Sequence, residues 1–181
     1  ASDVYKRQDR YLFEANGRYD GSSRFPRDLR WNLFPSVSVG WNIANESFWP
    51  IKEHVSMFKL RGSYGELGNQ YTDNWYPFYA TMPVSIANGT WLLNGQKTNT
   101  ASAPGLIAST LTWERVSSWN VGLDLRALSN RLGLSLEVYR RNTFDMIGPA
   151  PELPAILGTA VPRLNNAEMN SRGFEIELNW K

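Results

Sequence analysis

Few side chains in this sequence are of a kind that could perform covalent chemistry. His54 is the only histidine among the 181 residues, and the sequence contains no cysteine. A Ser-His-Asp arrangement, a thiol nucleophile and a thiolate or multi-histidine metal site therefore have almost no material. Glu175 and Glu177, two residues apart, could form a catalytic carboxylate pair. No base accompanies them, however, and we interpret them as a solvated strand face. We predict that the protein is not an enzyme and that it holds no cofactor or metal.

A long segment without periodicity, residues 67–111, holds the best candidates for ligand binding. A structureless connection of this length is uncommon in a compact soluble domain and usually serves a function or is disordered. Aromatic rings can stack on sugar rings, while side-chain amides can hydrogen-bond to sugar hydroxyls. The candidate ligand-binding residues are Asn74, Trp75, Tyr76, Tyr79, Trp91 and Asn94. The alternative is that these residues pack the segment against its neighbours or against a partner protein.

The clearest element that could position this segment is a strand predicted over residues 31–43, WNLFPSVSVGWNI. Its odd positions are all apolar, and its even positions are polar or small apart from Phe34, so one face is apolar and the other polar. Trp31 and Trp41 mark the two ends of the apolar face. At roughly 3.3 Å per residue and a tilt of about 40°, they stand about 25 Å apart along a membrane normal, the height of the apolar band of a membrane barrel. Pro35 cannot donate to a sheet ladder and predicts a bulge or a strand start.

Five further strands with the same alternation are predicted at residues 11–19, 58–66, 113–127, from 132 onward, and 170–180. A slip of one residue would turn Asn120, Asp124, Glu175 and Glu177 to the apolar side, so the register is strongly specified. Aromatic residues again lie near the ends of the apolar faces. We predict a membrane girdle that consists of Tyr11, Tyr19, Trp31, Trp41, Tyr64, Trp119 and Trp180.

The connections between these strands alternate in length. Those at residues 44–57 and 128–130 are short, whereas those at 67–111 and 148–168 are long, which is typical of a barrel with short periplasmic turns and long extracellular loops. Ser47, ahead of Pro50 and Glu53, predicts one short helix in the first connection. The pair Arg140-Arg141 is expected at a strand end near the lipid headgroups, and His54 in a turn on the periplasmic side.

The overall composition narrows the function further. A mean hydropathy of −0.41 and the lack of an apolar run near 18 residues argue against spanning helices. A net charge of +2 without a basic run does not favour nucleic acid as a partner. Residues 1–8 match nothing that follows, and we interpret them as a non-native or uninformative leader. The opening ASDVYKRQDR has no apolar signal region, so the natural N-terminus of an exported protein is expected to lie outside this sequence.

Several segments resemble one known family in the order in which they occur. The segments YDGSSRF (19–25), FPSVSVGWNI (34–43) and LRGSYGELGNQ (60–70) look like the C-terminal barrel region of SusC/RagA-type TonB-dependent transporters. So do LTWERVSSWNVGLDLRALSNRLGLSLEVYRRNTFDMI (111–147) and NSRGFEIELNW (170–180). The likeness is collinear and covers most of residues 11–181.

The resemblance implies that the intact protein is an outer-membrane barrel of a Gram-negative bacterium with roughly 22 strands, filled by an N-terminal plug. It would import glycan or peptide fragments, with a SusD-like surface lipoprotein as its lid and the TonB–ExbB–ExbD complex as its source of energy. The plug, the TonB box and the export signal do not occur in this sequence. We therefore expect residues 9–181 to be an all-β, antiparallel up-and-down segment of the transmembrane barrel, about six strands in contact with outer-membrane lipid, and an open sheet by itself.

Two other classes of protein are weighed against this one. A soluble carbohydrate-binding β-sandwich would use the same tryptophan-rich loops, but its apolar faces would be buried against each other. An outer-membrane lipase or protease is disfavoured by the lone His54. Convergence of Val37, Val39, Leu123, Leu134 and Ile176 into a closed, dry interior would rule out the membrane interpretation.

Overall fold

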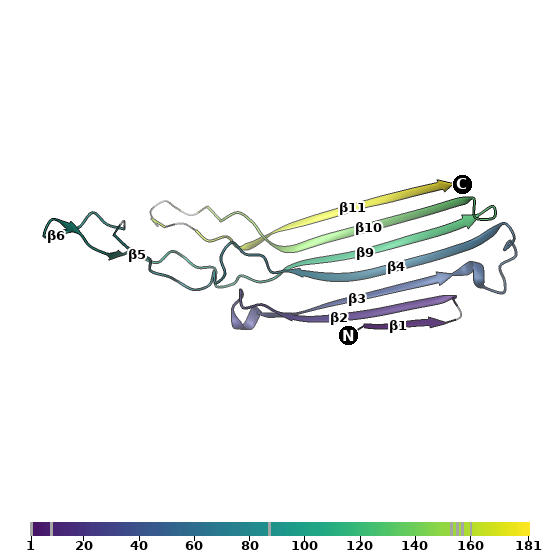
Figure 1. The fold of residues 1–181 in the computed structure, drawn as a ribbon, viewed down its shortest axis with the longest axis horizontal. Coiled ribbons are helices and arrows are strands. Elements are labelled where there is room, and N and C mark those ends of the chain that lie inside the picture. The colour runs from purple at the N-terminus through teal and green to yellow at the C-terminus, as the bar shows by residue number, and fades with distance from the viewer. Residues whose placement is uncertain are drawn as a thin grey trace.

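A computed structural model describes residues 2–7, 9–86, 88–152, 154, 156, 158–159 and 161–181. The described residues form one seven-stranded antiparallel sheet in the order β1-β2-β3-β4-β9-β10-β11 (Figure 1). Its strands are β1 (Ser2–Arg7), β2 (Tyr11–Gly21), β3 (Trp31–Asn42), β4 (Val55–Asn69), β9 (Glu114–Ala127), β10 (Leu132–Ile147) and β11 (Asn165–Trp180). Within this sheet each strand pairs only with the sheet strands next to it in the chain. The short strands β5 (Val84–Ser85), β6 (Leu92–Leu93), β7 (Gln96–Lys97) and β8 (Thr100–Ala101) lie within the connection from β4 to β9 and are not part of the sheet. The predicted up-and-down, all-β fold is confirmed.

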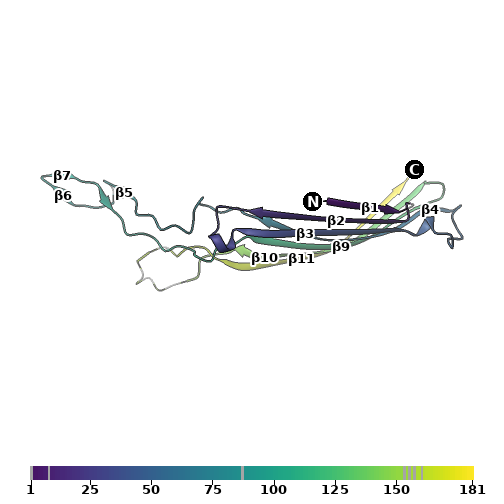
Figure 2. The same ribbon diagram turned by 90° about the horizontal axis from the view of Figure 1, so that it is seen from below.

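The sheet is a single curved layer, and its two edges stay open within the described chain. Figure 2 shows the curvature, with the segment from β5 to β8 extending far beyond one end of the sheet. The edge strands β1 and β11 have one neighbour each, β2 and β10. No helix among the described residues is long and apolar enough to cross a membrane. The open sheet predicted from the sequence is thus confirmed.

The register places the apolar residues of all six long strands on one face. Phe13 pairs with Val39, Val39 with Gly62, and the row continues through Val121, Val138 and Phe174. The side chains of Val37, Val39 and Ile176 are 41%, 51% and 64% exposed, and Leu123 and Leu134 are half-buried. These five residues do not converge into a closed interior. The sandwich architecture is therefore wrong for the described residues.

Several predicted boundaries and local features are wrong. The register of β3 against β2 runs unbroken from Trp31 to Trp41, so Pro35 causes neither a bulge nor a strand start. Pairing of β3 with β4 begins only at Ser36, which leaves Pro35 without a partner on that side, where its missing N–H carries no penalty. Arg140 lies in the middle of β10 and not at a strand end.

The predicted short helix at Ser47 is absent from the described residues. A 3-10 turn, η2 (Ile43–Asn45), and hydrogen-bonded turns take its place, among them the bond from the Val55 N–H to the Ile51 carbonyl at 2.9 Å. A segment this short and interrupted by Pro50 cannot repay the cost of nucleating a helix. His54 lies in this turn region, as predicted.

Residues 2–7, where no strand was expected, form β1 along β2, with Tyr5 opposite Phe13. Whether residues 1–8 are native stays a prediction. The long connections are also shorter than predicted, because residues 67–69 belong to β4 and residues 165–168 to β11. The first of them contains two small pairings, β5 (Val84–Ser85) with β8 (Thr100–Ala101) and β6 (Leu92–Leu93) with β7 (Gln96–Lys97).

A small aromatic core explains why Phe34 breaks the alternation of β3. Phe34 is buried with Phe25, Ala108, Leu111 and Trp113 at the long-connection end of the sheet. The centroids of the Phe34 and Trp113 rings are 5.5 Å apart in an edge-on arrangement. The Trp113 indole N–H also donates to the Arg30 carbonyl at 2.9 Å, which ties the long connection to the short 3-10 turn η1 (Arg27–Leu29). The core thus fills the place where β3 and β4 are no longer paired.

Gly68 is the position beside this core that has the least room for a side chain. A Cβ atom at Gly68 would lie 2.0 Å from Cζ of Phe34, so Gly68→Ala must displace a buried ring. We expect a loss of about 1–3 kcal/mol in the free energy of unfolding, measured by denaturant titration. Gly17→Ala is the control, because a Cβ there meets nothing within 4 Å. Equal stability of the two variants would contradict the packing described here.

Candidate functional site

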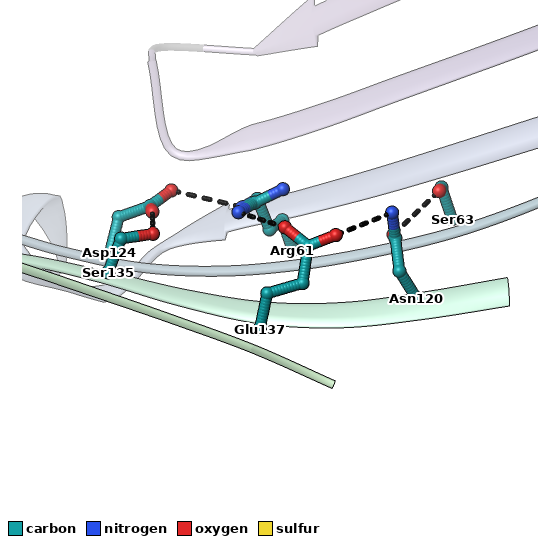
Figure 3. Close-up of polar contacts among 6 residues, drawn as sticks. All are labelled: Arg61, Ser63, Asn120, Asp124, Ser135 and Glu137. Carbon is teal, nitrogen blue, oxygen red and sulfur yellow. Dashed lines mark hydrogen bonds and ion pairs between the residues drawn. The ribbon is translucent and has the colours of Figure 1, made fainter. Parts of the chain in front are cut away.

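The polar face of the sheet carries a connected network of six side chains centred on Arg61 of β4 (Figure 3). Its guanidinium Nη2 lies 2.5 Å from Glu137 Oε2 of β10, and its Nε lies 3.3 Å from Asp124 Oδ2 of β9. Asn120 donates to Glu137 at 3.0 Å and accepts a hydrogen bond from Ser63 at 2.7 Å. The Ser135 hydroxyl donates to Asp124 at 2.8 Å. All six side chains are half-buried, and together they link three adjacent strands.

The network can form because the register places a glycine of β9 between Arg61 of β4 and Glu137 of β10. Arg61 is opposite Gly122 of β9, and Gly122 is opposite Glu137 of β10. A Cβ atom at Gly122 would lie 2.7 Å from Nε of Arg61. The Arg61 side chain therefore crosses β9 directly above Gly122 to reach the next strand. Any other residue at position 122 would force the Arg61 side chain to shift from this path.

The two glutamates considered as a carboxylate pair both lie on the polar face of the edge strand β11. Glu175 lies opposite Glu137, and Glu177 lies opposite Ser135 on the edge strand β11, and both are exposed. Glu177 accepts a hydrogen bond from Asn179 at 2.8 Å. Across the described residues no three His, Cys, Asp or Glu side chains are grouped in a way that could hold a metal ion. The face supplies charges and hydrogen-bonding groups that suit a water-filled interior.

The structure brings some of the predicted ligand-binding residues together. The rings of Tyr76 and Tyr79 are 6.2 Å apart, and Phe78 lies 4.4 Å from Tyr79. The Trp75 ring is 72% exposed, and the Arg24 guanidinium stacks over it at 4.3 Å. Arg24 also donates to the Thr72 carbonyl at 3.2 Å, which fixes the start of the long connection to the turn after β2.

Trp91 and Asn94 do not join this group. Trp91, 77% exposed, precedes β6 at the end of the long connection that is furthest from the sheet (Figure 1). Asn94 and Gly95, with φ of 52° and 75°, form the turn between β6 and β7. An Asn-Gly pair is a strong hairpin signal, so the turn at Asn94 could have been predicted from the sequence. Among the ring contacts of the described residues, none joins Trp91 to Trp75, Tyr76 or Tyr79.

Asn74 lines a hollow of about 300 Å³ between the two long connections. Pro77, Leu106, Ile147 and Arg163 also line it. Arg163 Nη1 lies 3.6 Å from Asp73 Oδ2, an ion pair that joins the two connections across the hollow. Sequence reasoning missed this hollow, because no pattern within one connection shows which residues of the other lie beside it.

The predicted girdle aromatics all lie on the apolar face and are all exposed. Six of the seven occur in neighbouring pairs: Tyr11 stacks with Trp41 at 6.3 Å and Tyr19 with Trp31 at 5.3 Å. Tyr64 and Trp119 are opposite each other on β4 and β9. Trp180, at the end of β11, pairs with Leu132.

Glu46, in the turn after β3, holds one of these aromatic pairs. The Tyr11 hydroxyl and the Trp41 indole N–H both donate to its Oε1, at 2.7 and 3.1 Å. These two hydrogen bonds, with the charge of Arg10 nearby, lower the pKa of the Glu46 carboxyl below its usual range. The carboxylate thus stays ionised and fixes the two rings at the short-turn end of the sheet.

These features define a class of protein: a meander with one exposed apolar face edged by aromatics and one polar, hydrogen-bonded face. The chain belongs to the TonB dependent receptor-like beta-barrel family, whose model matches residues 1–181. It is similar to the TonB-dependent receptor SusC of Bacteroides thetaiotaomicron, 32% identical over 98% of this chain and 18% of that protein. It is also similar to the TonB-dependent receptor P3 of Formosa agariphila, 30% identical over 97% of this chain and 17% of that protein.

Solved structures agree with this assignment. A structure of the RagAB peptide transporter aligns with a TM-score of 0.81 and 28% identity over 98% of this chain and 19% of that chain. The RagAB peptide importer in its closed-closed state aligns with a TM-score of 0.82, covering 18% of that chain. The chain thus spans less than a fifth of the length of these relatives. The SusC/RagA-type resemblance seen in the sequence is confirmed.

Arg61 is the residue whose removal tests the polar network. Arg61→Gln leaves Asp124 and Glu137 without their cation, and we expect a loss of about 1–2 kcal/mol in the free energy of unfolding, given the partial exposure of the groups. The control is Arg163→Gln, because the ion pair of Arg163 with Asp73 is exposed on both sides; its loss should stay below about 0.5 kcal/mol. Combining Arg61→Gln with Glu137→Gln should recover part of the loss. A double-variant cycle without coupling would contradict the network.

Proposed function

We propose that this chain forms part of the wall of an outer-membrane, TonB-dependent importer of glycan or peptide nutrients in a Gram-negative bacterium. The observation that carries the proposal is the continuous register of exposed apolar side chains across the six long strands, with the Arg61 network on the opposite face. Lipid would cover the apolar face, and the polar face would line the interior. The proposed role is walling and recognition, without catalysis; the relatives described above are named as receptors.

The positions of the girdle aromatics support this orientation. Trp41 of β3 is linked through the pairings with Leu60, Leu123 and Leu136 to Ile176 of β11, and Trp180 lies four residues further along β11. Four residues of about 3.3 Å over four strand spacings of about 4.8 Å give a slant of about 35°. Strands of membrane barrels tilt by about 35–45°. Trp41 and Trp180 would therefore lie at one height in a tilted barrel wall.

The open edges of the sheet support further strands beside it. Unpaired N–H and C=O groups in lipid cost several kcal/mol each, so β1 and β11 would pair with other strands of the same barrel. By the family resemblance this barrel would have roughly 22 strands, a plug, a SusD-like surface lipoprotein as its lid, and a TonB–ExbB–ExbD complex as its energy source. The long connections, at residues 70–113 and 148–164, would be extracellular.

The membrane orientation is testable with spin labels, since the sequence contains no cysteine. Single cysteines at positions 36 to 39 of the full-length receptor in lipid bilayers would carry the label. Labels at Val37 and Val39 should collide with oxygen, which concentrates in lipid, and labels at Ser36 and Ser38 with a water-soluble nickel chelate. A sandwich interior would instead protect Val37 and Val39 from both reagents, and that result would overturn the proposal.

The ligand-binding role of the aromatic connection is part of the same proposal. Asn74, Trp75, Tyr76, Tyr79, Trp91 and Asn94 would contact the oligosaccharide or peptide, with the hollow beside Asn74 as the concave part of the site. Replacing Trp75, Tyr76 and Tyr79 together with alanine should weaken the apparent affinity of uptake about tenfold or more, because buried aromatic anchors dominate interfaces.

Uptake of labelled oligosaccharide and oligopeptide pools by cells that carry the receptor measures this affinity and separates the two ligand classes. Tyr71→Ala is the control, because Tyr71 is an exposed aromatic of the same connection outside the Tyr76–Tyr79 group. Undiminished uptake by the triple variant, at equal receptor levels in the membrane, would exclude these residues from the binding site.

A further inference from the structure

We propose that Arg140 of β10 and Arg172 of β11 bind a phosphate group of a membrane lipid at the edge of the apolar face. The proposal rests on the membrane orientation put forward above. It adds a binding site on the outside of the wall, which is separate from the interior and from the aromatic connection.

The register places the two arginines side by side on the face that carries the apolar residues. Arg140 lies directly opposite Arg172, and its other neighbour across the sheet is Trp119. Two residues along each strand, Val138 lies opposite Phe174 on the same face. Side chains directly opposite each other have their Cβ atoms about 5 Å apart, and like charges in this arrangement destabilise a sheet. Two cations so placed call for an anion between them.

No carboxylate supplies that anion among the described residues. Some arginines of the sheet are ion-paired: Arg115 with Glu66 at 2.8 Å, Arg18 with Asp20 at 2.7 Å, and Arg61 with Asp124 and Glu137. The ion pairs within the described part of the chain include neither Arg140 nor Arg172. Uncharged amides hold Arg140 instead. Its Nε donates to Asn142 Oδ1 at 3.2 Å, and the Asn170 amide, with its oxygen turned toward Arg140, accepts from Nη2 at 2.8 Å. These contacts orient the guanidinium without neutralising it.

The surroundings of the pair identify the anion as part of a lipid. On one side along the strands the face is apolar, from Val138 and Phe174 through Leu136 and Ile176. On the other side the next pair is polar, Asn142 opposite Asn170. A ligand seated here would place acyl chains on the apolar side and a charged group between the guanidinium groups. Arginine binds phosphate oxygens with two parallel hydrogen bonds, so a lipid phosphate matches both the charge and the geometry.

The same register row carries aromatic side chains on the neighbouring strands. Trp119 is opposite Tyr64, so the row from β4 to β11 reads Tyr64, Trp119, Arg140 and Arg172. Aromatic and basic side chains are the groups that gather at the height of lipid headgroups. In the proposed orientation the strands slant and the long connections are extracellular, so this row rises toward β11. Arg140 and Arg172 therefore lie nearer the outer boundary of the apolar band than Tyr64 and Trp119 do.

The test compares two double variants of the full-length receptor in detergent micelles. Arg140→Gln with Arg172→Gln removes the pair, and Arg126→Gln with Arg141→Gln removes the same charge from alternate positions on the other face. Retention of added dioleoyl phosphatidic acid is measured by native mass spectrometry, with dioleoyl phosphatidylcholine as the lipid without an exposed phosphate monoester. We expect the first double variant to retain phosphatidic acid at least about tenfold less than wild type, and the second to retain it normally.

The outcomes separate this inference from the membrane proposal. Equal retention by wild type and the Arg140/Arg172 variant, in a receptor whose spin labels show Val37 and Val39 in lipid, would overturn the inference alone. Millimolar inorganic phosphate that displaces the lipid completely would also overturn it, because the apolar face would then contribute nothing. Spin labels that place Val37 and Val39 away from lipid would overturn both proposals.

Discussion

The two-residue period of the strands is the constraint on which the whole structure depends. Each long strand pairs with its neighbours so that apolar side chains fall opposite apolar ones, as in the row from Val39 to Phe174. A shift of one residue in β9 or β10 would turn Asp124 or Glu137 to the apolar side and break the Arg61 network. Few side chains are buried in this single-layer sheet. The strand register, rather than a packed core, therefore determines which side chains contact one another.

Within that register, two large side chains reach across a neighbouring strand where glycine gives them room. Arg61 passes over Gly122 to an acid on the next strand but one, and the ring of Phe34 lies against Gly68. The first crossing ties three strands together by charge. The second closes the splayed end of β3 and β4 with an aromatic ring. Glycine thus acts here through the space that it leaves for a neighbour and not through unusual backbone angles.

The sequence predicted the strands, their order and their apolar faces, because alternation is a local pattern that each strand carries by itself. It did not predict β1, whose partner β2 lies beyond a turn and whose own alternation is weak. It misread Pro35, since a proline is tolerated where one neighbouring strand has not yet begun to pair. The Arg61 network was invisible for another reason: residues 61, 124 and 137 are joined by register across three strands, and no local spacing shows that.

The positions of the candidate ligand-binding residues also depend partly on local sequence and partly on contacts with distant residues. Trp75 is held because Arg24, 51 positions earlier in the chain, stacks over its ring. Arg24 directly precedes Phe25, which is part of the buried core with Phe34. Trp91 lies beside a two-residue strand in a hairpin that has no comparable anchor in the buried core. A rigid position lowers the entropy lost on binding, whereas a mobile one adds reach. The core at the rim of the sheet therefore fixes Arg24, and through it the ring of Trp75, whereas Trp91 lies far from this core.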